Sequence, residues 1–353
     1  MNYPALKIDL KKIEANTRLL VEKCAAYNIK VSAVTKAFCG IPEVAEAMVK
    51  GGAAYLADSR VENLIKMKHI KQPKMLLRIP MLSQVKEVVE YADISLNSEY
   101  KVIKALSDEA QEKRKCHDII LMVDLGDLRE GVWADEAVEY AGKIIKLEGV
   151  RLIGIGTNLT CYGAVIPKVD NLSKLVEIAE NIEKKYGVKL SIISGGNSSS
   201  YYLVENGTIP KGINNLRLGE SVVLGNETAY GNRIEGTYND CFTLCAEIIE
   251  LKEKPSVPIG EIGVDAFGNK PTYVDRGIRK RAILAIGKQD VRIDGLTPID
   301  KKIIILGASS DHMIVDVTDS ETDYSIGDII EFTMDYGALL SLSTSDYVYK
   351  VIE

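Results

Sequence analysis

A lysine at the end of an early apolar segment is the residue whose position points most directly to chemistry. Lys36 closes residues 30–36 in the sequence KVSAVTKAFCG, and small residues and a glycine follow it. If this segment is a strand of a parallel barrel, the lysine lies at the barrel mouth, where burial lowers its pKa. A neutral amine there can attack a carbonyl or hold an aldehyde cofactor. A solvated surface lysine could have the same local sequence, so other segments are needed to tell whether Lys36 belongs to an active site.

A glycine- and serine-rich segment predicts a site for an anion. Residues 189–200, KLSIISGGNSSS, read as a strand, two glycines and the start of a helix. Backbone N–H groups and small hydroxyls at a helix N-terminus bind anions, most naturally phosphate. An ordinary helix cap explains one serine but not two glycines with three serines. Gly219 and Glu220, which follow a later apolar segment, could offer further N–H groups to the same anion.

Two arginines also follow apolar segments. Arg129 comes after the strand-like part of DIILMVDLGDLREG, and Arg217 ends the apolar part of NNLRLGESVVLG. A guanidinium fork at a barrel mouth suits a carboxylate, because it donates two parallel hydrogen bonds. A surface ion pair with Glu130 or Asp127 explains Arg129 equally well. Arg217 could bind phosphate, substrate or a structural carboxylate.

Strand-like and helix-like segments alternate over roughly the first 200 residues. Amphipathic stretches with apolar residues at i, i+3 and i+4 separate the strand-like segments. The strand-like segments are residues 5–10, 30–36, 54–59, 74–80, 93–97, 118–126, 150–159 and 189–195. Eight such βα units predict a closed (β/α)₈ barrel of the TIM type. An open doubly wound sheet is the alternative, weakened because no G-x-G-x-x-G follows the first strand.

The pattern changes in the last third of the chain. From about residue 239 the helical period vanishes, and short strand-like runs alternate with glycine, proline and aspartate. We therefore predict an α/β protein whose barrel, at residues 1–228, is followed by a smaller all-β domain at residues 239–353.

Composition restricts the classes of function. The 353 residues carry a diffuse net charge of −6, which argues against a nucleic-acid surface. The chain has no run of 18 apolar residues and no signal-peptide core at its start, so we expect a cytoplasmic protein that does not bind membranes. Six cysteines without a C-x-x-C pair and three scattered histidines predict no metal site.

Together these segments resemble the alanine racemase type of pyridoxal-phosphate enzymes, most of all its alanine/ornithine racemase branch. The segments VTKAFCG, MVDLGDLREGV, GIGTNLT, SGGNSSS, LRLGESVVLG and TSDYVYKVI follow the order of that family over nearly the whole chain. The resemblance implies that Lys36 carries pyridoxal 5′-phosphate, that Arg217 faces its pyridine nitrogen, and that Arg129 binds the substrate carboxylate. The residues that would hold the phosphate are Asn197, Ser198, Gly219, Glu220 and Tyr347.

The implied chemistry is racemisation with two proton donors. A pyridine nitrogen that faces arginine stays unprotonated, so the ring is a weaker electron sink and the proton returns to Cα. Lys36 serves one face. The tyrosine that serves the other face in the family comes from the partner subunit and falls here on Lys288, in RAILAIGKQDV. Asp311 and His312 occupy another segment near the partner's site, so a homodimer with composite active sites is expected.

Two departures from the family bear on the substrate. Asn158 replaces a histidine that stacks on the cofactor, and Met122 replaces a modified lysine that orients the substrate arginine. Both changes argue against a plain alanine racemase and favour a longer, basic substrate, ornithine first. Its terminal ammonium needs a carboxylate, for which Asp127, Asp290 and Asp311 are available; Asp311 is the expected ligand.

Other functions stay open at this stage. The same barrel occurs in alanine and broad-specificity racemases and in non-catalytic pyridoxal-phosphate-binding proteins, although the latter resemble the barrel alone. An amino-acid decarboxylase would have a longer chain and a late cysteine that the segment ASSDHM lacks. A metal-dependent aldolase or dehydratase would need a His/Cys metal pair near the C-terminus.

Overall fold

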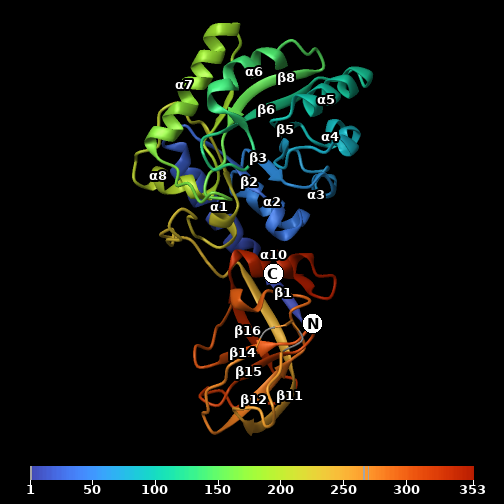
Figure 1. Ribbon diagram of the computed structural model, residues 1–353, viewed down its shortest axis with the longest axis vertical. Coiled ribbons are helices and arrows are strands. Elements are labelled where there is room, and N and C mark those ends of the chain that lie inside the picture. The colour runs from blue at the N-terminus through green and yellow to red at the C-terminus, as the bar shows by residue number, and fades with distance from the viewer. Residues whose placement is uncertain (1, 265–266, 269) are drawn as a thin grey trace. The chain divides into compact units, whose positions relative to one another are not determined.

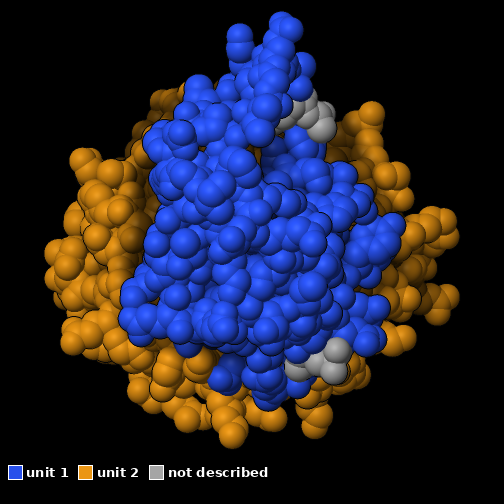
Figure 2. All heavy atoms as spheres, turned by 90° about the horizontal axis from the view of Figure 1, so that it is seen from below, with its two compact units in different colours: residues 1–9, 240–353 blue, residues 10–239 orange. Residues whose placement is uncertain are grey.

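The computed structural model describes residues 2–264, 267–268 and 270–353, and the chain divides into two compact units. One unit comprises residues 10–239 and the other residues 1–9 with 240–353 (Figures 1 and 2). We call them the barrel unit and the β unit.

Eight parallel strands close into a barrel within the barrel unit. Each pairs with the next along the chain, and the last pairs with the first. The strands are β2 (Lys30–Val34), β3 (Tyr55–Asp58), β4 (Lys74–Leu76), β5 (Ile94–Asn97), β6 (His117–Asp124), β8 (Val150–Gly156), β9 (Ile192–Ser194) and β10 (Asn215–Leu218). The two-residue strand β7 (Val132–Trp133) adds to β6. The predicted (β/α)₈ architecture is confirmed.

Helices alternate with these strands, as the amphipathic pattern predicts (Figure 1). They are α1 (Leu10–Ala25), α2 (Pro42–Lys50), α3 (Val61–Lys66), α4 (Val85–Tyr91), α5 (Tyr100–Glu112), α6 (Ala137–Ile144), α7 (Val169–Tyr186), α8 (Tyr201–Glu205) and α9 (Glu220–Val223). Short 3₁₀ turns are η1 (Lys36–Phe38), η2 (Leu82–Gln84), η3 (Ala134–Glu136) and η4 (Ser198–Ser200). No helix in the described part of the chain is long and apolar enough to span a membrane.

The first apolar segment belongs to a different sheet from the one expected. β1 (Ala5–Ile8) pairs antiparallel with β11 and parallel with β17 in the β unit, and β10 takes the eighth place in the barrel. An apolar run shows that a segment is a strand but not which sheet it joins, so the pattern could not separate these two. The barrel was expected to span residues 1–228, whereas the compact barrel unit begins at residue 10 because β1 belongs to the β unit.

The β unit is a mostly antiparallel sheet with the order β13-β16-β11-β12-β15-β14, to which β1 and β17 add. Its elements are β11 (Phe242–Pro255), β12 (Ile278–Leu284), η5 (Ile293–Gly295), β13 (Leu296–Pro298), β14 (Ile304–Ala308), β15 (Met313–Asp316), β16 (Ile329–Met334), α10 (Tyr336–Thr344) and β17 (Tyr349–Ile352). The predicted C-terminal β domain is confirmed.

The barrel interior has an apolar part and a polar part. An apolar cluster gathers side chains from six strands, among them Val34, Met122 and Ile192. Side chains two residues apart on a strand share a face, so Ser194 points inward like Ile192. Its hydroxyl donates to Oδ1 of Asn215 at 2.7 Å. Ser194 is the last residue of β9, so this polar part of the interior lies at the carboxyl end of that strand.

Candidate active site

Lys36 lies at the carboxyl end of the barrel, two residues after β2 ends. It opens the turn η1, which Cys39 closes in a left-handed conformation with its N–H donating to the carbonyl of Lys36. Burial lowers the pKa of the Lys36 amine, and the positive charge of Arg129 acts in the same direction. The amine is therefore neutral at a lower pH than an ordinary lysine, as a nucleophile or base requires.

A buried carboxylate fixes the residue before this lysine. Asp58, the last residue of β3, accepts hydrogen bonds from Thr35 Oγ1 at 2.6 Å and Asn63 Nδ2 at 3.0 Å. Burial raises the pKa of Asp58, while these two hydrogen bonds lower it. Sequence reasoning missed Asp58, although an aspartate directly at a strand end was the available signal.

Arg217 is a buried cation at the end of β10. Its guanidinium donates to Ser194 Oγ, to the carbonyl oxygen of Thr157 at 2.7 Å and to Asn158 Oδ1 at 3.3 Å. Burial lowers the pKa of Arg217 to about 10, so it stays protonated at neutral pH. Only 4% of the residue is exposed, and the bonds to neutral oxygens hold the guanidinium in place.

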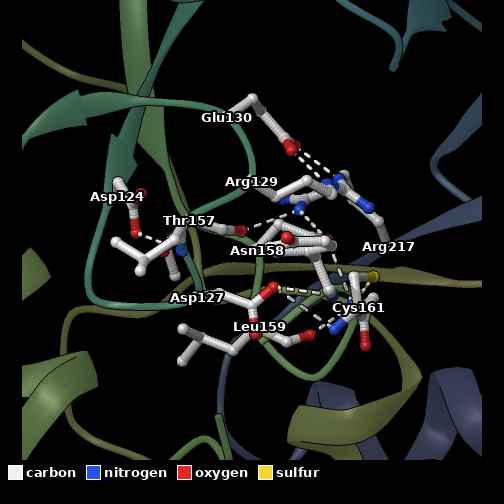
Figure 3. A network of polar contacts seen from close by, with 12 residues as sticks. Asp124, Asp127, Arg129, Glu130, Thr157, Asn158, Leu159, Cys161 and Arg217 are labelled. Atoms are coloured by element: carbon white, nitrogen blue, oxygen red, sulfur yellow. Dashed lines mark hydrogen bonds and ion pairs between the residues drawn. The ribbon is translucent and has the colours of Figure 1, made fainter. Parts of the chain in front are cut away.

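Arg129 and Asn158 lie beside Arg217 (Figure 3). Arg129 forms an ion pair with Glu130 through two N–H groups, which is one of the two interpretations that the sequence allowed. Burial opposes the charge of Arg129, but the hydrogen bonds with Glu130 raise its pKa. In one orientation of the Asn158 side-chain amide, Oδ1 accepts a hydrogen bond from Arg217 Nη2. If the amide is rotated by 180°, its oxygen instead accepts from Arg129 Nη2 at 3.0 Å. One asparagine therefore lies between two arginines.

The two segments expected at the phosphate site come together. Asn197 caps η4, since its Oδ1 accepts from the N–H of Ser199 at 2.8 Å. The hydroxyl of Ser198 lies 3.3 Å from the N–H of Gly219 and 3.0 Å from Ser221 Oγ. A Cβ at Gly219 would lie 3.1 Å from that of Val34, so a small residue is needed at this approach. The first residue of α9, Glu220, follows directly.

Asp127 holds a neighbouring loop and is therefore not available as a substrate ligand. Its buried carboxylate accepts from the N–H groups of Tyr162 at 3.0 Å and Val165 at 3.1 Å. Burial would raise the pKa of Asp127, but these backbone donors lower it. The loop carries Cys161 (Figure 3), whose thiol lies 3.5 Å from Asn197 Nδ2. Cys161 was not singled out from the sequence, and its place after a strand end was the only signal.

The remaining expected residues lie in the β unit, on loops that hydrogen bonds connect. The N–H of Lys288 donates to the carbonyl of Ser309 at 2.9 Å, which brings the segment of Lys288 beside that of Asp311. Lys288 Nζ lies 4.0 Å from the ring centroid of Phe267. Asp311 Oδ1 lies 2.9 Å from His312 Nδ1.

A third loop joins the same group. Asp290 accepts from Ser345 Oγ at 2.7 Å, and the same hydroxyl accepts from the N–H of Tyr347 at 3.2 Å. Tyr347 is two-thirds exposed. Lys288, Asp311 and Tyr347 thus come from three connected loops of the β unit, whereas Lys36 and the other predicted residues belong to the barrel unit.

Two further observations limit the site. Across the described residues, no group of three or more His, Cys, Asp or Glu side chains could hold a metal ion. A cavity of about 710 Å³ lies near the amino ends of β9 and β10, lined among others by Tyr27, Ser191 and Lys211. Since Lys36 and Arg217 are at the carboxyl ends of their strands, this cavity is not the candidate site.

The fold and site define a barrel protein with a strand-end lysine, a buried arginine and a serine-lined helix start. Residues 8–227 match the family described as alanine racemase, N-terminal domain. The chain is 56% identical to ornithine racemase of Acetoanaerobium sticklandii over 99% of both chains. It is 45% identical to lysine racemase of Thermotoga maritima, over 100% of this chain and 99% of that protein. The chain belongs to the alanine racemase family.

Solved structures of the family share the fold at low sequence identity. Alanine racemase from Streptomyces lavendulae superimposes with a TM-score of 0.75 at 18% identity, covering 99% of this chain and 96% of that one. Alanine racemase from Bartonella henselae, with covalently bound pyridoxal phosphate, gives 0.74 at 18% identity over 99% of both chains. These likenesses support the architecture of a barrel with a following β domain.

Proposed function

We propose that this protein is a pyridoxal-phosphate-dependent racemase of basic amino acids, with ornithine as its main substrate. The observation that carries this proposal is the 56% identity to an ornithine racemase along the whole chain. The 45% identity to a lysine racemase favours the same kind of side chain. The barrel-mouth residues fit the chemistry.

The residues at the carboxyl end of the barrel fit the cofactor. Lys36 offers an amine of lowered pKa for its aldehyde, and Ser198 with the N–H of Gly219 forms a place for its phosphate. Arg217 is a buried donor suited to the pyridine nitrogen. Asn197 lies beside this group and bonds to Asn158. When bound, the cofactor would supply a ring that accepts electrons from the substrate Cα.

The other residues that we assign to this site include Glu220 and Tyr347, which would help to hold the phosphate. Because Arg217 keeps its proton at neutral pH, it donates a hydrogen bond without transferring the proton. Arg129 would receive the substrate α-carboxylate with a guanidinium that stays charged. Lys36 would then remove or return the proton at Cα on one face.

The opposite face needs a second proton donor, and we assign it to Lys288 of the partner subunit in a homodimer. Asp311, on the neighbouring loop, would bind the terminal ammonium of ornithine. Its exposed carboxylate is held by Ser310 and His312, and the hydrogen bond with His312 lowers its pKa, so it is ionised at neutral pH. A carboxylate in that state suits an ammonium ligand.

The proposal is tested by incubating the protein and pyridoxal phosphate with single L-amino acids in deuterium oxide. Ornithine should racemise and gain deuterium at Cα, lysine more slowly, and alanine little. The matched variants are Lys36→Ala, which should abolish both signals and the cofactor's absorbance, and Lys30→Ala at the exposed start of β2, which should retain them. Racemisation of alanine alone would replace the substrate assignment, and absence of cofactor uptake would reject the proposal.

A further inference from the structure

The strongest unassigned feature at the barrel mouth is the contact between two adjacent residues, Arg129 and Glu130. Nε and Nη2 of the arginine each meet one oxygen of the carboxylate, so the pair is bidentate. Only 16% of the Glu130 side chain is exposed, against 40% of the Arg129 side chain. A bidentate pair fixes the plane of a guanidinium as well as its position.

The turn that carries the pair is closely constrained. Asp124 Oδ1 accepts from the N–H of Gly126 at 2.8 Å and of Leu128 at 3.2 Å. Leu128 has a left-handed φ of 57°, and Gly131 has a φ of 135°. A Cβ at Gly131 would lie 2.4 Å from the backbone nitrogen of Asp124, so the turn closes tightly on β6. The backbone therefore holds the pair over the end of the barrel.

Glu130 is the carboxylate that bonds to one of the basic side chains gathered near this turn. Lys36, Arg129 and Arg217 bring three basic groups to the barrel mouth. Asp127 directs its carboxylate at backbone N–H groups of another loop. Glu130, by contrast, bonds to one arginine, and its charge raises the pKa of the other.

Two neighbouring residues lie against the guanidinium of Arg129. Glu130 takes the edge formed by Nε and Nη2, and the amide of Asn158 lies 3.2 Å from Nη1 and 3.0 Å from Nη2. We propose that Glu130 is a positioning residue, which holds Arg129 so that Nη1, the guanidinium nitrogen that does not bond to Glu130, receives the substrate α-carboxylate. This inference rests on the proposed function for the identity of the carboxylate ligand.

The first test needs no catalysis. Arginine labelling by phenylglyoxal, mapped by mass spectrometry, is compared in cofactor-free wild type, Glu130→Gln, Glu130→Asp and the exposed control Glu136→Gln. Exposed Arg114 serves as the internal reference. Loss of the charged pair should raise labelling of Arg129 about tenfold in Glu130→Gln, less in Glu130→Asp and not in Glu136→Gln. Equal labelling in all four proteins would overturn the inference.

The second test separates positioning from a merely structural role. In Glu130→Gln the KM for ornithine should rise about ten- to a hundredfold while kcat changes little, and Glu130→Asp should recover part of the loss. An unchanged KM would overturn the inference, even with a change in labelling. If wild type racemises no amino acid, the proposed function fails, and the labelling ratio decides alone whether Glu130 holds Arg129.

Discussion

The hydroxyl of Ser194 accepts a hydrogen bond from the guanidinium of Arg217 inside the barrel, where neither residue is more than 4% exposed. The same hydroxyl donates to Asn215 Oδ1, and Asn215 Nδ2 donates to Ser32 Oγ at 2.8 Å. A buried charge is tolerated only when polar partners replace its lost water. The polar part of the barrel interior therefore supports the arginine at its end.

Replacing Ser194 should destabilise the barrel unit through this arginine. Ser194→Ala leaves a buried guanidinium N–H without its partner, so the free energy of unfolding should fall by about 1–3 kcal/mol. Urea denaturation measures the loss. Ser191→Ala is the matched control, because its exposed hydroxyl donates to the backbone carbonyl of Ile153 at 3.2 Å and not to a buried charge. If both variants lose the same small amount of unfolding free energy, Ser194 does not stabilise the buried guanidinium of Arg217.

The sequence allowed the barrel-mouth residues to be predicted because parallel strands end at one edge. Lys36, Ser198 and Gly219 each follow a strand, so the fold alone brings their segments to the same end of the barrel. The placement of β1 was wrong because its apolar pattern suits either sheet.

The interactions that the sequence did not reveal depend on distant donors. Asp127 bonds to N–H groups as far away as Val165, and Asp58 bonds back to Thr35 of an earlier strand end. Neither separation follows a helical or strand period, so no periodic signal exists. For Arg129, local sequence left an ion pair and a substrate role as alternatives, and the structure shows the ion pair with Glu130, with the amide of Asn158 beside both Nη atoms.

The lowered pKa of Lys36 should be visible in its reactivity. Burial favours the neutral amine, so in cofactor-free protein acylation of Lys36 should rise with pH and level off at a lower pH than that of an ordinary lysine. Pulse labelling with acetic anhydride at several pH values, read by mass spectrometry, measures this curve, with exposed Lys30 as reference in each sample. Coincident curves would show that the site does not favour the neutral amine.

A shared active site predicts complementation between two inactive variants. Lys36→Ala and Lys288→Ala should each lose at least about a hundredfold of racemase activity, the lower range for general acid–base catalysis. Mixed and reassembled at equal amounts, half of the dimers would be hybrids with one complete site. About a quarter of wild-type activity should therefore return.

Lys280→Ala, which replaces a half-buried lysine of the β unit that pairs with Asp323, is the control and should stay active. If the mixture stays inactive although hybrids are shown by mass spectrometry, Lys288 does not serve the partner's site. Full activity of Lys288→Ala alone would transfer the second proton donor to Asp311, His312 or another residue.

His117 should make the stability of the barrel unit depend on pH. It begins β6, is 3% exposed, and its Nε2 lies 2.7 Å from Ser95 Oγ. Burial lowers the pKa of His117 to about 4, whereas an unfolded histidine titrates near 6.5. Between these values the unfolded chain holds more protons than the folded one, so stability falls as pH falls through this window. The contribution of this one group is roughly 3 kcal/mol.

Urea unfolding between about pH 7 and pH 4.5 measures that dependence in wild type, His117→Asn and His69→Asn. The His117→Asn protein should be less stable at neutral pH, since it loses the packed imidazole, but its free energy of unfolding should change less on acidification. His69 is exposed beside Glu46, so His69→Asn should retain the wild-type slope. A slope in His117→Asn equal to that of wild type would mean that His117 is not the group whose protonation destabilises the barrel.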